Sequence, residues 1–185
     1  IRAFVRQLHA DGADVVKIFA SASIREGGAQ VMTDEQLQAV CGEANQLGLR
    51  TVAHAYGTES LTATIEAGCG GIEHGTRYDD TVIALMADRG TYLDPQIGLL
   101  WENYAEHKEA FLGRGNYTEE GFALMEQARV TGYETFQRTL AHGGVRVVYG
   151  TDAVAGAHGR NAEELIYRVR DGGQDAMDAI MSATS

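Results

Sequence analysis

Short apolar segments alternate with segments of helical periodicity along most of this 185-residue chain. This alternation constrains the fold more than any other feature, because strands that take turns with helices form βαβ units and a parallel sheet covered by helices. Five segments with the apolar, largely β-branched and aromatic character of buried strands are predicted to begin at Ala13, Leu49, Gly70, Thr91 and Val145. The predicted fold class is therefore α/β.

The segments between these strands carry the signals that start and stop helices. Thr33 and Gln36 form a capping-box pattern, and Gly48 suits the position just after the helix that follows. Further helices are predicted over residues 1–9, 58–67 and 79–89 and in the closing "DAIMSATS". A longer helical segment, 101–142, contains an aromatic group that forms either a lid over a site or a subunit contact: Trp101, Tyr104, Phe111 and Tyr117.

Polar side chains stand at the ends of four predicted strands. They are Lys17 in "VVKIFA", His54 in "VAHAY", His74 in "IEHG" and Asp152 in "VVYGTD". An open doubly wound sheet and a (β/α)8 barrel both fit the alternation, but barrel active sites are built at the carboxyl ends of the strands. The sequence therefore predicts an incomplete (β/α)8 barrel of about five βα units, with four polar groups on one rim.

The alternation of side chains along a strand supports this convergence. Residues two apart point to the same face. Three sets of residues therefore share one face of the sheet: Val15, Lys17 and Phe19; Val52, His54 and Tyr56; and Val148, Gly150 and Asp152. By the same rule Glu73, next to His74, is predicted to point away from the site, so it is not expected to be the general base.

The charge of the chain limits its partners. A formal net charge of -11 and a pI near 4.9 argue against nucleic acid or an anionic membrane as partner, because either would repel the chain. No apolar run approaches the roughly 18 residues of a membrane span. A small molecule is the expected partner, and a homo-oligomer is left open.

The two cysteines, Cys41 and Cys69, form neither a zinc motif nor a disulfide framework in the sequence pattern. They are interpreted as two small buried thiols in a reducing compartment, and a cytoplasmic location is expected. The first residues lack the apolar core of a signal peptide. They do not look like a native start, so a signal peptide in the parent protein stays open.

Four motifs taken in order resemble the amidohydrolase superfamily, above all its imidazolonepropionase-like branch with metal-dependent prolidases and carboxypeptidases. They are "VVKIFAS", "TVAHAYG", "GGIEHGT" and "VVYGTDA". The resemblance covers essentially the whole chain. It implies a metal-dependent hydrolase that cleaves a C–N bond in an amide, a short peptide or a cyclic amide, such as a dipeptidase, a prolidase or a carboxypeptidase.

The resemblance also implies a ligand set. Lys17 would be carbamylated by carbon dioxide and bridge two divalent metals, most simply Zn²⁺, with His54 and His74 on one ion and Asp152 on the other. An apolar strand lowers the pKa of an amine, so a neutral Lys17 can add carbon dioxide. An ion-paired lysine fits this segment poorly.

Other residues receive roles in catalysis or substrate binding. Asp152 is interpreted as the group that takes a proton from the nucleophile and passes it to the leaving amine. Tyr56 either donates a hydrogen bond to the scissile carbonyl or fills the barrel mouth as an aromatic group. Three residues either meet a substrate carboxylate or are solvated loop residues: Arg77, His158 and Arg160.

The sequence departs from the family in one respect: it contains no H-x-H motif, the first-strand metal ligands of the family. Residues 1–185 are therefore expected to be the C-terminal portion of the barrel domain, without strands one to three and without the small β-domain. Two alternatives stay open. One is a mononuclear, deaminase-like amidohydrolase, and the other is a non-catalytic barrel remnant or interaction module.

Overall fold

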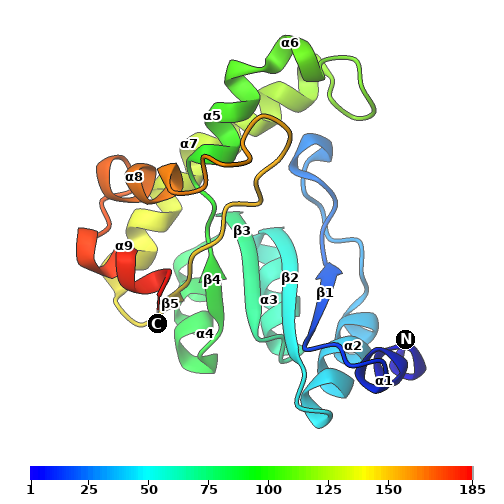
Figure 1. Cartoon of the computed structure of the whole chain (residues 1–185). Coiled ribbons are helices and arrows are strands. Elements are labelled where there is room, and N and C mark those ends of the chain that lie inside the picture. The colour runs from blue at the N-terminus through cyan, green and yellow to red at the C-terminus, as the bar shows by residue number, and fades with distance from the viewer. Residues whose placement is uncertain (185) are drawn as a thin grey trace.

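The computed structural model describes residues 1–184 and contains one parallel sheet with the strand order β1-β2-β3-β4-β5 (Figure 1). The strands are β1 (Val15–Phe19), β2 (Arg50–Gly57), β3 (Gly71–Arg77), β4 (Tyr92–Asp94) and β5 (Arg146–Val147). This confirms the predicted α/β class and the five βα units. Within the described residues, β1 and β5 pair on one side only and form the two edges of the sheet.

Helices cover one face of this sheet (Figure 1). The first four are α1 (Arg2–Ala10), α2 (Asp34–Gln46), α3 (Thr58–Glu66) and α4 (Asp80–Arg89). In β1 the residues that face them, Val16 and Ile18, are buried, whereas Val15 and Phe19 on the opposite face are exposed. Side-chain alternation therefore separates an apolar, helix-covered face of the sheet from the face that carries Lys17.

The predicted boundaries of α2 are confirmed. The Thr33 hydroxyl accepts a hydrogen bond from the Gln36 backbone N–H at 3.3 Å, and the Gln36 side chain accepts one from the Thr33 N–H at 2.9 Å. Gly48, just beyond the helix, has a φ of 72°, in the left-handed region that favours glycine. Local sequence signals thus fix where this helix begins and ends.

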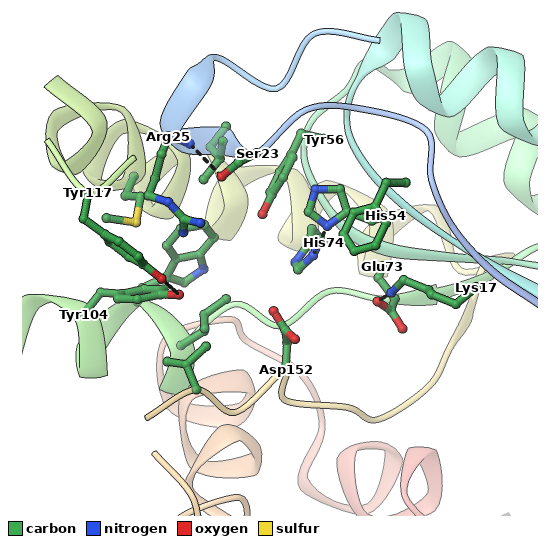
Figure 2. A pocket seen from close by; sticks show the side chains of 16 residues that line it. Lys17, Ser23, Arg25, His54, Tyr56, Glu73, His74, Tyr104, Tyr117 and Asp152 are labelled. Carbon is green, nitrogen blue, oxygen red and sulfur yellow. Dashed lines mark hydrogen bonds and ion pairs between the residues drawn. The ribbon is translucent and has the colours of Figure 1, made fainter. Parts of the chain in front are cut away.

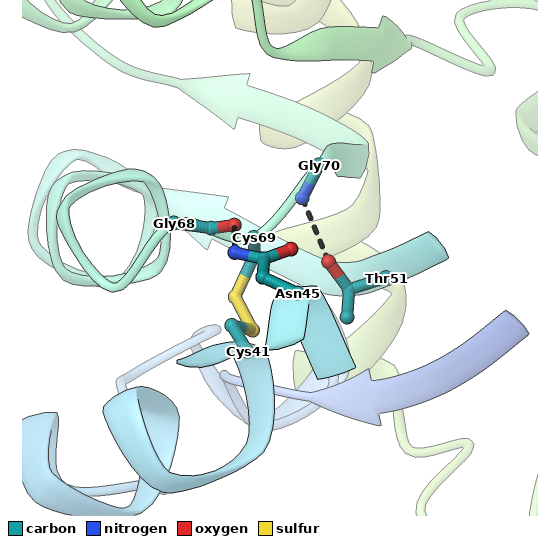
Figure 3. The surroundings of a disulfide bond; sticks show 6 residues. All are labelled: Cys41, Asn45, Thr51, Gly68, Cys69 and Gly70. Carbon is teal, nitrogen blue, oxygen red and sulfur yellow. Dashed lines mark hydrogen bonds between the residues drawn. A yellow bond between two sulfur atoms is a disulfide. The ribbon is translucent and has the colours of Figure 1, made fainter. Parts of the chain in front are cut away.

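The interpretation of the cysteines as separate thiols is wrong. Cys41 of α2 and Cys69, just before β3, form a disulfide with a Cα to Cα distance of 5.0 Å (Figure 3). Beside it the Asn45 side chain donates to the Gly68 carbonyl at 2.8 Å, and the Gly70 N–H donates to the Thr51 hydroxyl at 2.8 Å (Figure 3). The sequence separation hid this pairing, because consecutive βα units bring α2 and the start of β3 together.

The long helical segment lies at the carboxyl ends of the strands (Figure 1). It consists of α5 (Leu99–Glu106), α6 (Lys108–Phe111) and α7 (Glu119–His142), and the short 3-10 helix η1 (Ile24–Glu26) packs against α7. A second apolar cluster forms here and is partly aromatic: Ile24, Tyr56, Leu100, Trp101, Tyr104, Phe122, Met125 and Ala128. The predicted helical segment is confirmed, with breaks near His107 and at 112–118.

In the last part of the chain, buried charged side chains form hydrogen bonds with backbone groups. Helices α8 (Glu163–Arg170) and α9 (Ala176–Ser182) follow β5. The fully buried Glu164 carboxylate accepts hydrogen bonds from the N–H groups of residues 97–99 at 2.7, 3.0 and 2.8 Å. The fully buried Arg168 donates to the Val148 carbonyl at 2.5 Å and to the Ser182 hydroxyl at 3.1 Å.

Strand β5 is shorter than the predicted strand over 145–150, although Val148 still donates to the Leu93 carbonyl at 2.8 Å.

Among the described helices, none has both the length and the apolar character needed to cross a membrane.

Candidate active site

A pocket of about 340 Å³ opens at the carboxyl ends of the strands (Figure 2). The four predicted strand-end residues all line it, as does Tyr56: Lys17, His54, Tyr56, His74 and Asp152. The predicted convergence of these side chains is therefore present in the structure. Their roles as metal ligands and proton carrier stay predictions.

The two histidines form a close pair in this pocket. Nδ1 of His54 lies 2.8 Å from Nε2 of His74, and both side chains are buried. Burial lowers the pKa of His54 to about 4 and that of His74 well below its usual value. Both imidazoles are therefore neutral near pH 7, which is the state that binds a metal ion.

The outer nitrogen of His74, Nδ1, is buried and has no hydrogen-bond partner among the described residues. Among residues 1–184, however, no three His, Cys, Asp or Glu side chains form a group that could hold a metal ion. The neutral histidine pair supplies two nitrogen donors of the kind that a divalent ion binds, and Lys17 and Asp152 line the same pocket.

The backbone of β3 leaves the regular strand conformation at His74. Its φ is 74°, and that of Gly75 is 58°. This turn breaks the alternation of side chains, so Glu73 and His74 both line the pocket (Figure 2). The prediction that Glu73 points away from the site is therefore wrong.

Lys17 pairs with Glu73 across the sheet (Figure 2). Burial lowers the pKa of the Lys17 amine, and the charges of Asp152 and Asp94 partly offset this shift. The expectation that an ion-paired lysine fits this strand poorly is thus wrong, because the unexpected orientation of Glu73 supplies the partner. The lowered pKa agrees in direction with the prediction.

Asp152 reaches the pocket from the loop after β5. Its φ of 44° is unusual for a residue other than glycine. Burial raises the pKa of its carboxyl group, while the positive charges of Lys17 and Arg25 act in the opposite direction. A carboxyl with a raised pKa is better suited to carry a proton near neutral pH.

Asp94 at the end of β4 is a buried residue that the sequence reasoning missed. Its Oδ1 atom has no hydrogen-bond partner among the described residues, and Gln96 donates to Oδ2 at 2.8 Å. A Cβ atom at Gly150 would overlap Asp94 Oδ2, so a larger residue there would displace the Asp94 carboxylate. Asp94 stands at the end of a strand, as the four predicted residues do. The same signal, a polar residue at the end of a predicted strand, could therefore have identified it.

Tyr56 packs on the histidine pair. Its ring stacks on His74 with centroids 4.7 Å apart and an interplanar angle of 13°, and it meets His54 edge-on at 4.8 Å. Burial raises the pKa of its hydroxyl above the usual value, so this group stays protonated. Tyr56 therefore retains the hydrogen-bond donor that the predicted role requires.

The three residues proposed to meet a substrate carboxylate do not line the pocket. Arg77 donates to the Gly27 carbonyl at 2.6 Å, and Arg160 pairs with Glu163 and Glu106 on the surface. His158 is exposed. Arg25 of η1 lines the pocket instead, and no strand pattern pointed to it because it lies in the loop after β1.

Solved structures share this fold. The crystal structure of Aspergillus niger ochratoxinase aligns with a TM-score of 0.83 and 27% identity, over 99% of this chain and 41% of that chain. A Xaa-Pro dipeptidase with bound methionine aligns with a TM-score of 0.82 and 33% identity, over 99% and 45%. A prolidase complexed with N-methylphosphonate-L-proline aligns with a TM-score of 0.85 and 25% identity, over 99% and 44%.

Curated relatives agree with the structural neighbours. Ochratoxinase of A. niger is 29% identical over 192 residues, which is 100% of this chain and 38% of that protein. An uncharacterized protein of Mycobacterium tuberculosis is 36% identical over 138 residues, or 74% of this chain and 36% of that protein. The chain thus spans less than half the length of these relatives, and its fold resembles part of the amidohydrolase barrel. Residues 1–185 match the amidohydrolase family over their whole length, and the chain belongs to that family.

Proposed function

We propose that the protein containing this chain is a metal-dependent hydrolase that cleaves the amide bond of an acylated amino acid or a short peptide. The observation that carries the proposal is the neutral, buried pair of His54 and His74 in one pocket with Lys17 and Asp152. In this proposal residues 1–185 are the C-terminal portion of the barrel domain. Strands one to three and a small β-domain lie outside it.

The proposed ligands come from four elements of the chain. His54 and His74 would hold one divalent ion and Asp152 a second, a carbamylated Lys17 would contribute to both, and the remaining ligands would lie outside residues 1–185. Zn²⁺ suits this mixture of imidazole and carboxylate oxygen. When bound, the metal supplies Lewis-acid chemistry to the reaction.

The chain's own residues would move the protons. Asp152 accepts a proton from the attacking water and passes it to the leaving amine. Its raised pKa makes the carboxylate a stronger base for the first of these steps. Tyr56 donates a hydrogen bond to the oxygen of the scissile carbonyl as negative charge develops there. The protonated state of the Tyr56 hydroxyl supports this assignment.

Lys17 tests the two-metal form of the proposal most directly. The Lys17→Ala variant of the full-length protein should lose bound metal and activity, and short carboxylic acids at high concentration should restore part of both. If the variant keeps two metal ions per chain and normal turnover, Lys17 is a structural residue. The conservative variant Lys17→Arg keeps a positive charge beside Glu73 but cannot form the carbamate, so it should also lose metal and activity, without rescue because its side chain fills the space that the acid needs.

One observation favours the mononuclear alternative: Lys17 pairs with Glu73, and an ion-paired ammonium does not add carbon dioxide. Two measurements separate the candidates. One is the metal content by mass spectrometry, and the other is the hydrolysis of a panel of N-acyl amino acids and dipeptides. Two ions per chain and turnover support the proposal, whereas one ion with an unmodified Lys17 supports the deaminase-like alternative. No metal in a folded, inactive protein supports the non-catalytic remnant.

Two further expectations belong to the whole protein. Its partner would be a small molecule or a short peptide, and a homo-oligomer stays open. The expected cytoplasmic location stays a prediction, and the disulfide between Cys41 and Cys69 argues against it because disulfides persist mainly in oxidising compartments.

A further inference from the structure

Arg25 lies across the pocket from Lys17. Figure 2 shows Arg25, Tyr104 and Tyr117 on one side of the pocket and Lys17 with Glu73 on the other, with the histidine pair, Tyr56 and Asp152 between them. A substrate whose reacting carbonyl lies at the histidine pair can therefore reach Arg25 on one side of the pocket.

The Arg25 guanidinium is held in place by neutral groups. Its Nε donates to the Asn116 side-chain oxygen at 2.9 Å, and the guanidinium carbon lies 4.1 Å from the centre of the Tyr117 ring and 5.9 Å from that of Tyr104. The hydroxyls of the two tyrosines are 3.0 Å apart, which links α5 to the segment before α7. These contacts orient the planar head of Arg25, whose charge acts on Asp152 without forming an ion pair with it.

No carboxylate within the described residues forms an ion pair with Arg25. The nearby arginines Arg129 and Arg160 differ, since each is paired with two glutamates. The two terminal NH₂ groups of Arg25 are likewise without a hydrogen-bond partner in the part of the chain that the structure describes. A half-buried guanidinium with two unused parallel donors is a preformed fork for a planar anion.

We propose that Arg25 binds the free carboxylate of the substrate, so that the enzyme selects N-acyl amino acids or peptides with a free C-terminus over their C-terminal amides. This inference rests on the proposed hydrolase function and names the group that the site recognises. Two apolar residues that line the same pocket, Leu100 and Trp101, offer a surface for the side chain next to that carboxylate. Arg25 is thus a specificity-determining residue that contacts the substrate away from the scissile bond.

A matched substrate pair tests the inference in the full-length, metal-loaded protein. N-acetylphenylalanine and its C-terminal amide differ in the carboxylate alone. A hydrogen-bonded charge is worth about 1.5–3 kcal/mol, so kcat/KM for the acid should exceed that for the amide by about 10- to 150-fold. Arg25→Met should remove this preference, mainly through KM for the acid, and change the amide by less than about threefold.

Two more variants control the experiment. Arg25→Lys keeps the charge without the planar fork and should keep part of the preference. Arg114→Met removes an exposed arginine from the same region, outside the pocket, and should leave the preference unchanged. Equal loss of acid and amide hydrolysis in Arg25→Met would mean that Arg25 only supports the fold of the loop, and the inference would be overturned while the proposed function stands.

Direct binding measurements distinguish the proposed carboxylate site at Arg25 from the proposed hydrolase function. Calorimetric titration of the Asp152→Asn variant with each compound should show tighter binding of the acid by about 10-fold or more, lost when Arg25→Met is added. If the protein hydrolyses neither these two compounds nor any member of the N-acyl amino acid and dipeptide panel, yet shows this binding difference, the hydrolase proposal is wrong and the carboxylate site is supported. Equal binding of acid and amide refutes the carboxylate site.

Discussion

The two halves of the chain hold their backbone in place by different means. Residues 1–94 form regular βα units whose strands are covered by one continuous apolar cluster, with Ile72 and Leu93 almost fully buried. In residues 95–184 the strand is only two residues long, and fully buried charges, Glu164 and Arg168, bind backbone groups from distant segments. The first half is organised by hydrophobic periodicity and the second by long-range polar contacts.

The pocket is built where these halves meet, with His54 and His74 from the first and Asp152 from the second. Apolar packing tolerates small adjustments, whereas a buried charge is costly unless its partners are in place. We infer that the first half sets the position of the histidines, and that the polar contacts of the second half fix the loop that carries Asp152. The predictions below test this division.

The largest effect is expected for Asp152→Asn, which removes a charge from the pocket without changing its shape. In the full-length protein turnover should fall about 10³-fold or more, because a proton carrier and a proposed ligand are lost together. Thermal stability should stay close to that of the wild type. Asp88→Asn, at an exposed position of α4, is the control and should keep full turnover. Near-normal turnover in Asp152→Asn would show that the second half supplies no reacting group.

The second prediction concerns Arg168, the buried cation of the second half. Arg168→Met should lower the free energy of unfolding by about 3–5 kcal/mol, because the Val148 carbonyl and the Glu164 carboxylate lose a buried partner. Urea unfolding monitored by circular dichroism measures the change. Arg170→Met on the same helix is the matched control, since Arg170 is exposed and pairs with its neighbour Asp171. Equal stability of the two variants would contradict the importance of the buried charges.

The third prediction concerns the disulfide, which belongs to the first half. Replacing Cys41 and Cys69 together by alanine should lower the free energy of unfolding by about 3 kcal/mol, because a bond across 28 residues restricts the unfolded chain. Reductant should destabilise the wild type by a similar amount and leave the double variant unchanged. Since the disulfide lies far from the pocket, kcat per folded molecule should be the same in the double variant and the wild type. A loss of turnover would show that the first half also controls the site at long range.

The same division explains what the sequence could predict. The strands through β4, the capping box of α2 and the convergence of Lys17, His54, His74 and Asp152 all follow from local patterns, period two in strands and 3.6 in helices. The convergence survives the turn at His74 because that residue and its neighbour Glu73 both reach the pocket. The orientation of Glu73 could not be predicted, since the left-handed backbone has no local signature there.

Contacts between segments far apart in sequence were likewise hidden. Arg25 enters the pocket because Asn116 and Tyr117 pack on it, and these residues are about ninety positions away. Arg77 and Arg160, which follow strand ends, looked more suitable but are held outside by other partners. Specificity residues in loops depend on which segments meet, and a single sequence does not contain that information in its periodicity.

The smallest effect is expected from the titration of Glu164. Burial raises the pKa of its carboxyl from the usual value of 4.5 to about 7, with the hydrogen bonds from residues 97–99 and the charge of Arg168 acting in the opposite direction. Between these two values the folded protein holds a proton that the unfolded chain has released. Stability from this group is therefore present at low pH and is lost as the pH rises through 7, by about 2 kcal/mol between pH 5 and 7.5. Glu164→Gln removes the titration, so its free energy of unfolding should change less over that interval than that of the wild type, as measured by urea unfolding at both pH values. An identical pH dependence of the two proteins would show that Glu164 stays ionised at pH 5, and that its bonds to the backbone of residues 97–99 outweigh the cost of burying its charge.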